Sequence, residues 1–169
     1  MKYILCSLIL ALVFAACSKK DHDNTIVSDV DIYFMQQVAY SNYAAMDAAT
    51  IALENANDSS VKLFAANVIT TQGKIQNDLE ELAVQLTIQL PDTADAAHQA
   101  KTAHLATLSG HQFDTAYINT QLVDFQNTIN LYNKELSDGN NAQIIQFARL
   151  YLPDIVDQWQ DAFDIQATL

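Results

Sequence analysis

The sequence has 169 residues with 20 acidic and eight basic side chains, which gives a formal net charge of −12 at pH 7. All of the acids but only five of the bases lie from Asp21 onward, so this part of the chain repels phosphate, and nucleic acid is excluded as a partner. A chain of this length buries its apolar side chains in a single core, and we expect one domain.

Residues 1–16 have the pattern of a bacterial export signal. Lys2 supplies a positive start, residues 3–14 form an apolar run, and two alanines provide the small residues that a signal peptidase needs. The run is too short to span a bilayer, which takes about 20 apolar residues. Cys17 follows directly, and this arrangement resembles the lipobox of bacterial lipoproteins, in which cleavage leaves the cysteine as the acylated first residue. The alternative is an ordinary secretory signal with an unrelated cysteine beside the cut.

The lipobox resemblance implies that Cys17 carries covalent lipid and that residues 17–28 form a polar tether. Two or more acyl chains hold a protein stably on a bilayer, so the predicted partner is a membrane reached through the anchor. With Cys6 removed and Cys17 acylated, no thiol remains for a disulfide, a zinc site or a nucleophile. The predicted location is the cell envelope. By resemblance to lipoprotein sorting patterns, Ser18 after the cysteine favours the outer membrane. The sequence does not decide between the periplasmic and the surface face of that membrane.

From residue 29 onward the apolar residues recur at helical spacing, and no stretch alternates with the period of a strand. Asp58 or Ser59 is expected to cap the second of two long helices, which ends before Pro91. The apolar stripes of these helices are Val30, Phe34, Val38, Ala45, Ala48 and Ala52, then Val61, Phe64, Ala65, Val68, Ile75, Leu79, Leu82 and Leu86.

Asp92 or Thr93 is predicted to cap a shorter, alanine-rich helix that reaches about Leu108. Two further long helices follow, separated at Gly139, and Pro153 is expected to kink the last one. Their apolar stripes are Ile118, Leu122, Phe125, Ile129, Tyr132 and Leu136, then Ile144, Ala148, Tyr151, Ile155, Trp159 and Ala162.

Four long amphipathic helices with short turns predict an all-α, antiparallel four-helix bundle over residues 29–169, with the alanine-rich helix between the two hairpins. A weak internal echo suggests that the hairpins are related. Residues 61–65 read Val-Lys-Leu-Phe-Ala, and residues 144–148 read Ile-Ile-Gln-Phe-Ala, each after a capping segment. Glycine-rich phosphate loops and the G-x-S-x-G turn of serine hydrolases are absent from the sequence.

Seven short segments carry a family resemblance through their order and spacing. They are Ile51–Ala56, Val61–Ala65, Asp78–Ala83, His98–Gln99, Leu108–Gly110, Phe113–Tyr117 and Leu152–Pro153. Together they resemble DUF4142, a ferritin-like domain-of-unknown-function family of exported bacterial proteins. The resemblance covers nearly everything from Asp31 to Ala167 and implies a ferritin-like four-helix fold. It implies little about activity.

The same resemblance implies histidines inside the bundle at positions that here read Gln72, Phe125 and Gln158. The apolar stripes independently place Gln72 and Phe125 inward, with Gln158 at the stripe edge. A carboxylate–histidine metal centre needs carboxylates and imidazoles from facing helices, and no Glu-x-x-His pair is present. Asp95 and His98 are spaced for two ligands, but two exposed ligands do not make a site. No metal and no cofactor are therefore predicted.

The best remaining carboxylate pair is Asp47 and Glu54, which are seven residues apart and share a helix face with Tyr40. A general acid and base would need a partner and a cleft, so we predict instead a half-buried pair bonded to glutamines or tyrosines. Asp114 and Tyr117 are interpreted as a carboxylate near a helix N-terminus and an aromatic ring at the end of the bundle.

These observations predict a lipid-anchored, extracytoplasmic helical bundle that acts without catalysis, as a binding or structural module. One alternative is a ferritin-like metal-binding or redox protein in envelope stress defence, which the fold permits and the missing histidines oppose. Another is a hydrolase of envelope polymers, which would need paired carboxylates in an open groove. The fold alone does not choose among these classes.

Overall fold

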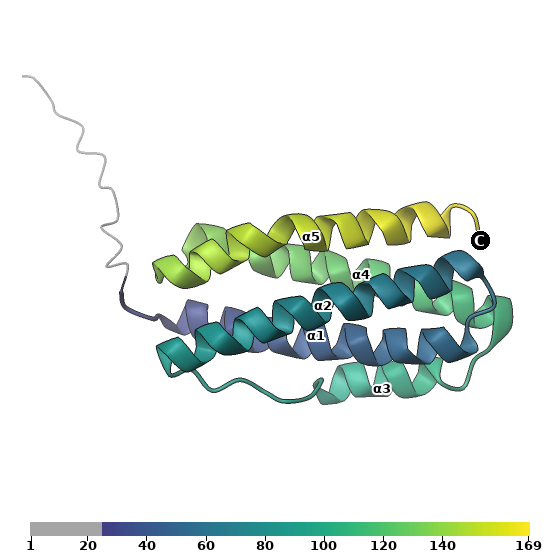
Figure 1. Cartoon of the computed structure of the whole chain (residues 1–169), viewed down its shortest axis with the longest axis horizontal. Helices are drawn as coiled ribbons and strands as arrows, with labels where there is room; N and C mark the ends of the chain where they lie inside the picture. The colour runs from purple at the N-terminus through teal and green to yellow at the C-terminus, as the bar shows by residue number, and fades with distance from the viewer. Residues whose placement is uncertain (1–24) are drawn as a thin grey trace, which may run out of the picture.

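The computed structural model describes residues 25–169, which contain five α-helices and no strand. The helices are α1 (Asp29–Asn55), α2 (Ser59–Leu86), α3 (Ala96–Leu105), α4 (Gly110–Asp138) and α5 (Ala142–Gln166). The four long helices run antiparallel to their neighbours, and the short α3 lies against the side of the bundle (Figure 1). The predicted ferritin-like, all-α bundle with a short helix between two hairpins is therefore confirmed. Over the same residues, no helix has the length and apolar character needed to cross a membrane.

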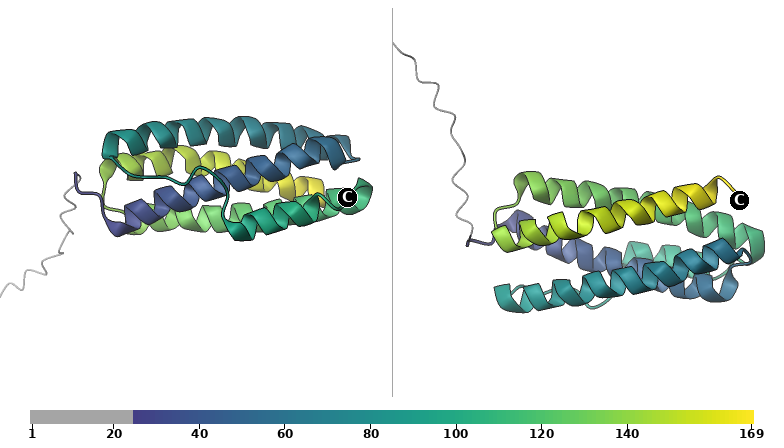
Figure 2. Two further views of the ribbon diagram at one scale, coloured as in Figure 1. Left: turned by 90° about the horizontal axis from the view of Figure 1, so that it is seen from below. Right: turned by 45° about the horizontal axis from the view of Figure 1, so that its top comes forward.

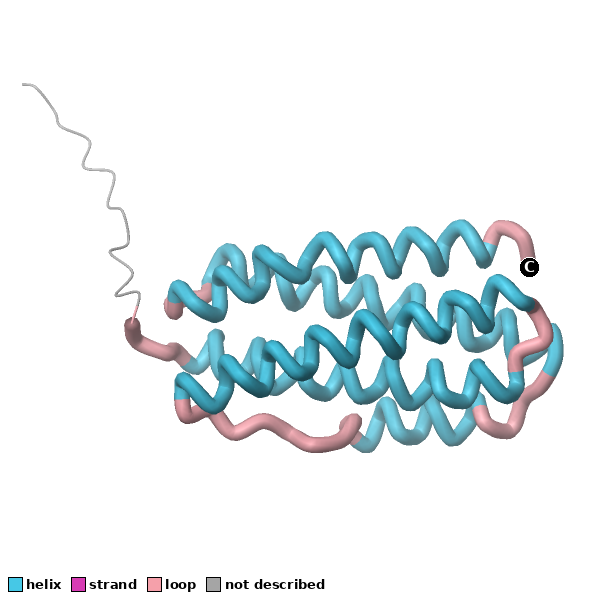
Figure 3. The backbone as a smooth tube through the Cα atoms, in the orientation of Figure 1, coloured by secondary structure: helices cyan, strands magenta, loops and turns pink. Residues whose placement is uncertain are grey.

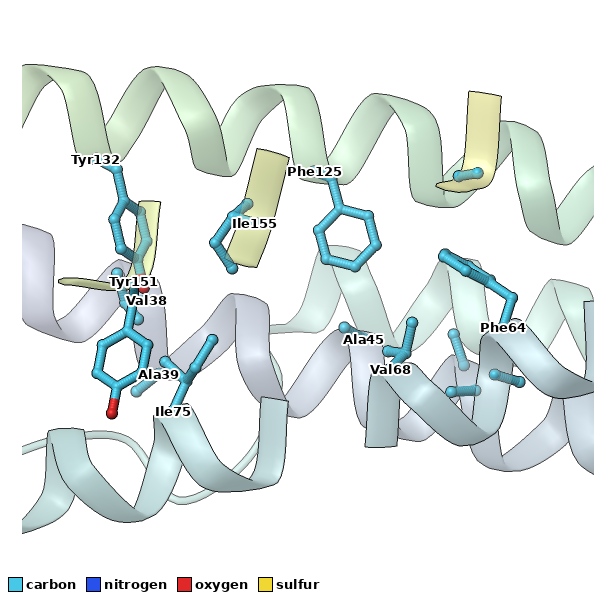
Figure 4. Packing of buried hydrophobic residues seen from close by; sticks show 14 of the residues in the cluster. Val38, Ala39, Ala45, Phe64, Val68, Ile75, Phe125, Tyr132, Tyr151 and Ile155 are labelled. Atoms are coloured by element: carbon cyan, nitrogen blue, oxygen red, sulfur yellow. The ribbon is translucent and has the colours of Figure 1, made fainter. Parts of the chain in front are cut away.

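The predicted stripes meet in the centre of the bundle and form one continuous core. Aromatic and branched side chains from α2, α4 and α5 fill most of it, as Figure 4 shows for Phe64, Ile75, Phe125 and Ile155. The buried face of α1 consists largely of alanine, which lets the neighbouring helices approach closely; its buried alanines are Ala39, Ala44, Ala45, Ala48, Ala49 and Ala52.

One buried carboxylate fastens the turn between α1 and α2. Asp114, in the first turns of α4, accepts hydrogen bonds from the backbone N–H of Asn57 at 3.0 Å and of Asp58 at 3.1 Å. Asp58 is itself the N-cap of α2, as predicted, and accepts the N–H of Ser60 at 2.7 Å. Asp114 therefore lies near the N-terminus of α4, as interpreted, but its oxygens bind the turn between α1 and α2, a role that the sequence did not indicate.

An equivalent carboxylate fastens the turn between α4 and α5. Asp31, in the first turn of α1, accepts the backbone N–H of Asn140 at 2.9 Å and of Asn141 at 3.1 Å. Each residue of this second set lies 83 positions from its counterpart in the first set (31 and 114, 57 and 140, 58 and 141). We name these two sets of bonds the turn clamps. They give a structural basis to the internal echo of the sequence, since each hairpin fastens the turn of the other.

The end of the predicted tether packs against the bundle. Ser28 caps α1 through a capping box with Asp31, and Val27 contacts the core. The carbonyl oxygens of Thr25 and Ile26 accept hydrogen bonds from the side chains of the two asparagines in the α4–α5 turn. Residues 25–28 are therefore part of the folded body rather than of a free tether. The signal peptide, Cys17 and the rest of the tether lie outside the described residues.

The short helix begins later than predicted. Its N-cap is Asp95, which accepts the N–H of His98 at 2.9 Å, so neither Asp92 nor Thr93 caps it. The preceding segment leaves α2 at Thr87, whose φ is 58°, and runs back along the bundle (Figures 2 and 3). Gln36 of α1 donates to the carbonyl of Gln89 in this segment at 3.1 Å. The segment is extended because it is fastened to α1, and α3 starts only after it.

Candidate functional site

Two of the three positions where the resemblance implies histidine meet inside the bundle. Gln72 of α2 donates from Nε2 to Oε1 of Gln158 of α5 at 2.5 Å. Their exposed fractions are 2% and 5%, so Gln158 is buried and does not lie at the edge of the core as the stripe indicated. Both helices turn these residues inward because each lies three or four positions from buried apolar neighbours.

The third position, Phe125 of α4, is an apolar packing site. Its exposed fraction is 3%, and its ring meets that of Phe64 edge-on with the centroids 6.4 Å apart. Figure 4 shows the ring projecting from α4 into the interior between Ile155 and Phe64. The sequence correctly predicted that Phe125 points inward.

This interior does not fit a carboxylate–histidine metal centre. Gln72 and Gln158 use amide groups that bond to each other, and Phe125 has no donor atom. Across residues 25–169, no three His, Cys, Asp or Glu side chains come together as a metal-binding group. Asp95 and His98 have another role, since Asp95 caps α3 and its Oδ1 lies 3.0 Å from Nδ1 of His98. Burial opposes a low pKa for Asp95, but the bonds from His98 lower it below the usual value.

The proposed pair of Asp47 and Glu54 does not form a half-buried cluster. Both side chains are exposed, and Tyr40 on the same face is only partly buried. The prediction of a half-buried, hydrogen-bonded pair is wrong because this face of α1 points to solvent. Although Asp47 is exposed, the neighbouring protein surface removes part of the hydration of its carboxylate and raises its pKa above the usual value.

A polar chain that the sequence analysis missed runs from the interior to the surface between α1 and α2. Asn42 donates to Gln76 at 3.0 Å, and Gln76 donates to Glu80 at 2.8 Å. Tyr43 donates to the same carboxylate at 3.0 Å, and burial together with Glu80 raises the pKa of Tyr43. Asn42 and Gln76 are buried on the inner faces of their helices, where the stripe pattern alone gave no reason to look for amides.

A groove lies between α2 and α5 on the outside of the amide pair. Its central part has a volume of about 370 Å³ and is lined from α2 by Asn67, Thr70, Thr71 and Lys74 and from α5 by Asp154, Asp157, Gln158 and Asp161. A second part of about 320 Å³ continues towards the C-terminal end of α5; it is lined by Ser60, Leu63, Phe64, Asn67, Asp161, Asp164 and Ile165. Asn67 and Asp161 border both parts, so we treat them as one feature, the α2–α5 groove.

A cation at the other end of this groove already has partners. Lys74 Nζ donates to the hydroxyl of Tyr151 at 2.6 Å and to Asp78 at 3.2 Å, and the tyrosine hydroxyl also donates to Asp78. The ammonium group also lies 4.5 Å from the centre of the Tyr151 ring. The hydrogen bond from Tyr151 and that from Lys74 lower the pKa of Asp78. Lys74 therefore does not neutralise the aspartates of α5.

The four long antiparallel helices with a short helix between the hairpins define a ferritin-like, all-α bundle. The family pattern described as "Domain of unknown function (DUF4142)" matches residues 16–165, and the chain belongs to this family. The sequence matches no curated protein.

Two solved structures share the fold. A DUF305 fragment from Deinococcus radiodurans superposes with a TM-score of 0.76 at 15% identity, covering 85% of this chain and 99% of its own. A DUF305 protein from Streptomyces coelicolor gives a TM-score of 0.71 at 14% identity, covering 82% of this chain and 91% of its own. At such low identity the similarity concerns the fold alone.

Proposed function

We propose that this protein is a lipid-anchored, non-enzymatic binding module on the extracytoplasmic side of a bacterial membrane. The observation that carries the proposal is the α2–α5 groove, which combines a buried amide at its floor with exposed aspartates along one wall. The groove offers groups that recognise a partner through hydrogen bonds and charge.

The arrangement of the body supports an anchor at its N-terminus. Thr25–Ser28 are fastened to one end of the bundle, and the C-terminus lies at the other end (Figure 1). The apolar part of the groove, at Ser60 and Ile165, lies towards the C-terminal end. A chain anchored through Cys17 would therefore present this part away from the membrane. The Streptomyces DUF305 protein is named as a predicted secreted protein, which agrees with an exported fold.

The anchor is tested by replacing Cys17 with serine. We expect Cys17→Ser to move the protein from the membrane fraction to the soluble fraction, with helix content and melting temperature unchanged, because the helices and the core described here are built from residues 25–169. Cys6→Ser is the matched control and is expected to stay with the membrane, since that cysteine leaves with the signal. Retention of Cys17→Ser in the membrane fraction would refute lipid anchoring.

The choice between a binding module and a metal or redox protein is tested by elemental analysis of the mature protein purified without chelators. We expect no stoichiometric transition metal, because the inward positions offer two mutually bonded amides and a phenyl ring. One iron, zinc or manganese ion per chain would overturn this part of the proposal and favour the metal or redox class.

A further inference from the structure

Four aspartates of α5 form a continuous charged wall along the α2–α5 groove. They are Asp154, Asp157, Asp161 and Asp164, all exposed. Their spacing of three or four residues keeps them on one face of the helix, over a length of about 15 Å. The facing wall on α2 is neutral apart from Lys74, which is bonded to Asp78 and Tyr151. This wall therefore attracts a ligand that carries several positive charges.

A buried donor at the floor of the groove lacks an acceptor. Gln158 lines the groove, its exposed fraction is 5%, and its Oε1 is occupied by Gln72. Its Nε2 has no hydrogen-bond partner among the described residues. A buried amide N–H costs free energy until it is paired, so a ligand in the groove whose oxygen acceptor reached this N–H would gain from pairing it.

The groove ends in an apolar hollow. Leu63, Phe64 and Ile165 line it beside Asp161 and Asp164, and the exposed fraction of Leu63 is 65%. Covering such a side chain with an apolar group removes its surface from water and favours binding. The ligand should therefore carry an apolar group close to its positive charges.

We propose that the α2–α5 groove binds a basic peptide segment. Lysine or arginine side chains pair with the α5 aspartates, a backbone carbonyl accepts the free N–H of Gln158, and an apolar side chain enters the hollow beside Leu63. This inference rests on the proposed function and names the partner class of the same binding module. A metal ion or a polyamine supplies charge but neither the carbonyl nor the apolar side chain. A second copy of this chain is disfavoured because it brings the same excess of acids.

The length of the groove sets the length of the probe. From Ser60 to Lys74 on α2 the helix rises about 21 Å, which an extended peptide spans with roughly six residues. The probe is therefore a fluorescent hexapeptide of two leucines followed by four lysines, blocked at both ends. Binding to the mature, detergent-purified protein is followed by fluorescence anisotropy at low salt. Comparison probes replace the lysines with glutamates or the leucines with serines, and spermidine is tested as a competitor.

We expect saturable binding of the lysine–leucine probe, weaker binding of the lysine–serine probe and none of the glutamate–leucine probe. Asp157→Asn/Asp161→Asn should weaken binding about tenfold, because two charge pairs are lost. The matched control Asp47→Asn/Glu54→Gln makes the same change of charge on the exposed face of α1 and should alter affinity less than about twofold. Equal weakening by both double variants would refute the groove as the site, since the attraction would then come from net charge alone.

The amide donor has its own matched pair of variants. Gln158→Leu removes the donor from the groove, whereas Gln72→Leu breaks the same internal hydrogen bond and leaves the donor in place. We expect only Gln158→Leu to weaken binding of the lysine–leucine probe. Circular dichroism checks that both variants keep their helix content. Absence of probe binding, or equal affinity for spermidine, would overturn the peptide assignment while leaving the lipid anchor intact. Release of the wild-type chain from the membrane would overturn the anchor and leave the groove measurement standing.

Discussion

A single hydrogen bond, between Gln72 and Gln158, joins α2 and α5 inside the bundle. Replacing Gln72 with leucine keeps a similar volume but leaves Oε1 of Gln158 buried without its donor. We expect Gln72→Leu to lower the free energy of unfolding by about 1–2 kcal/mol, measured by urea unfolding with circular dichroism.

The double variant Gln72→Leu/Gln158→Leu is the control for this prediction. Because it removes both partners, no buried amide is stranded, and it should be less destabilised than the sum of the two single variants. If the loss in the double variant equalled the sum of the losses in the two single variants, the two amides would contribute independently to the free energy of unfolding. Added metal should leave the melting temperature unchanged in all of them, because a ligand of the native state would raise it.

The buried carboxyl of Glu135 makes stability depend on pH. Burial, and next the neighbouring Asp31, raise the pKa of Glu135 from 4.5 to about 8. Between these values the folded protein keeps a proton that the unfolded chain loses. The free energy of unfolding therefore falls as pH rises through this window, by at most about 1.4 kcal/mol per pH unit, and levels off above pH 8.

Glu135→Gln should abolish this loss, because a glutamine has no proton to release. Urea unfolding of both proteins from pH 5 to pH 9 measures the difference, and parallel curves for the two would contradict the prediction.

Asp31 has the opposite effect on the free energy of unfolding, and its effect falls at acidic pH. Burial alone would raise its pKa, but the bonds from Ser28 and Asn140 lower it below 3.8, so its contribution is present above that pH and lost as pH falls further.

At the scale of the helices, the turn clamps are expected to contribute more to the free energy of unfolding than ordinary helix caps do. Asp114→Ala removes two hydrogen bonds from backbone N–H groups to a buried carboxylate, and we expect a loss of about 2–3 kcal/mol in the free energy of unfolding. Amide exchange at Asn57 and Asp58 should accelerate. Asp29→Ala removes an exposed acid from the first turn of α1 and should cost less than about 1 kcal/mol. An equally small effect of Asp114→Ala would show that the turn holds without its clamp.

The helices themselves followed from the sequence because apolar spacing reflects which side of a helix faces the core. The stripes predicted the four long helices, and Asp58, one of the two predicted caps of α2, is its N-cap. The start of α3 was not predictable, because it depends on how the segment before Asp95 is fastened to α1. Local propensity had favoured Asp92 or Thr93, and the tertiary contact outweighed it.

The residues of the site were predicted only where an apolar stripe indicated that their side chains face the core. Gln72 and Phe125 lie inward as expected, whereas Gln158, which the stripe placed at its edge, is buried and bonded to Gln72. The exposure of Asp47 and Glu54 depends on which helix covers which face of α1, and a stripe does not contain that information. The α5 aspartates were visible at three- and four-residue spacing, but the groove beside them exists only once α2 is packed against α5.

For the whole molecule, charge repulsion is the main electrostatic term. From Asp21 onward 20 acids face five bases, and the exposed ion pairs that form, such as Lys134 with Asp138, contribute little. Raising NaCl from about 0.02 to 0.5 M should increase the melting temperature by about 3 °C or more, because salt screens the repulsion. The increase should shrink at pH 4.5, where part of the carboxylates are neutral. A melting temperature that falls with salt would contradict this account.

The reciprocal arrangement of the turn clamps also determines how the molecule can come apart. The start of α1 holds the turn of the second hairpin, and the start of α4 holds the turn of the first. Detaching one hairpin therefore strands two backbone N–H groups in the turn of the other and a buried carboxylate in each half. We therefore expect the two halves to open together, with the four long helices behaving as one cooperative unit in amide exchange.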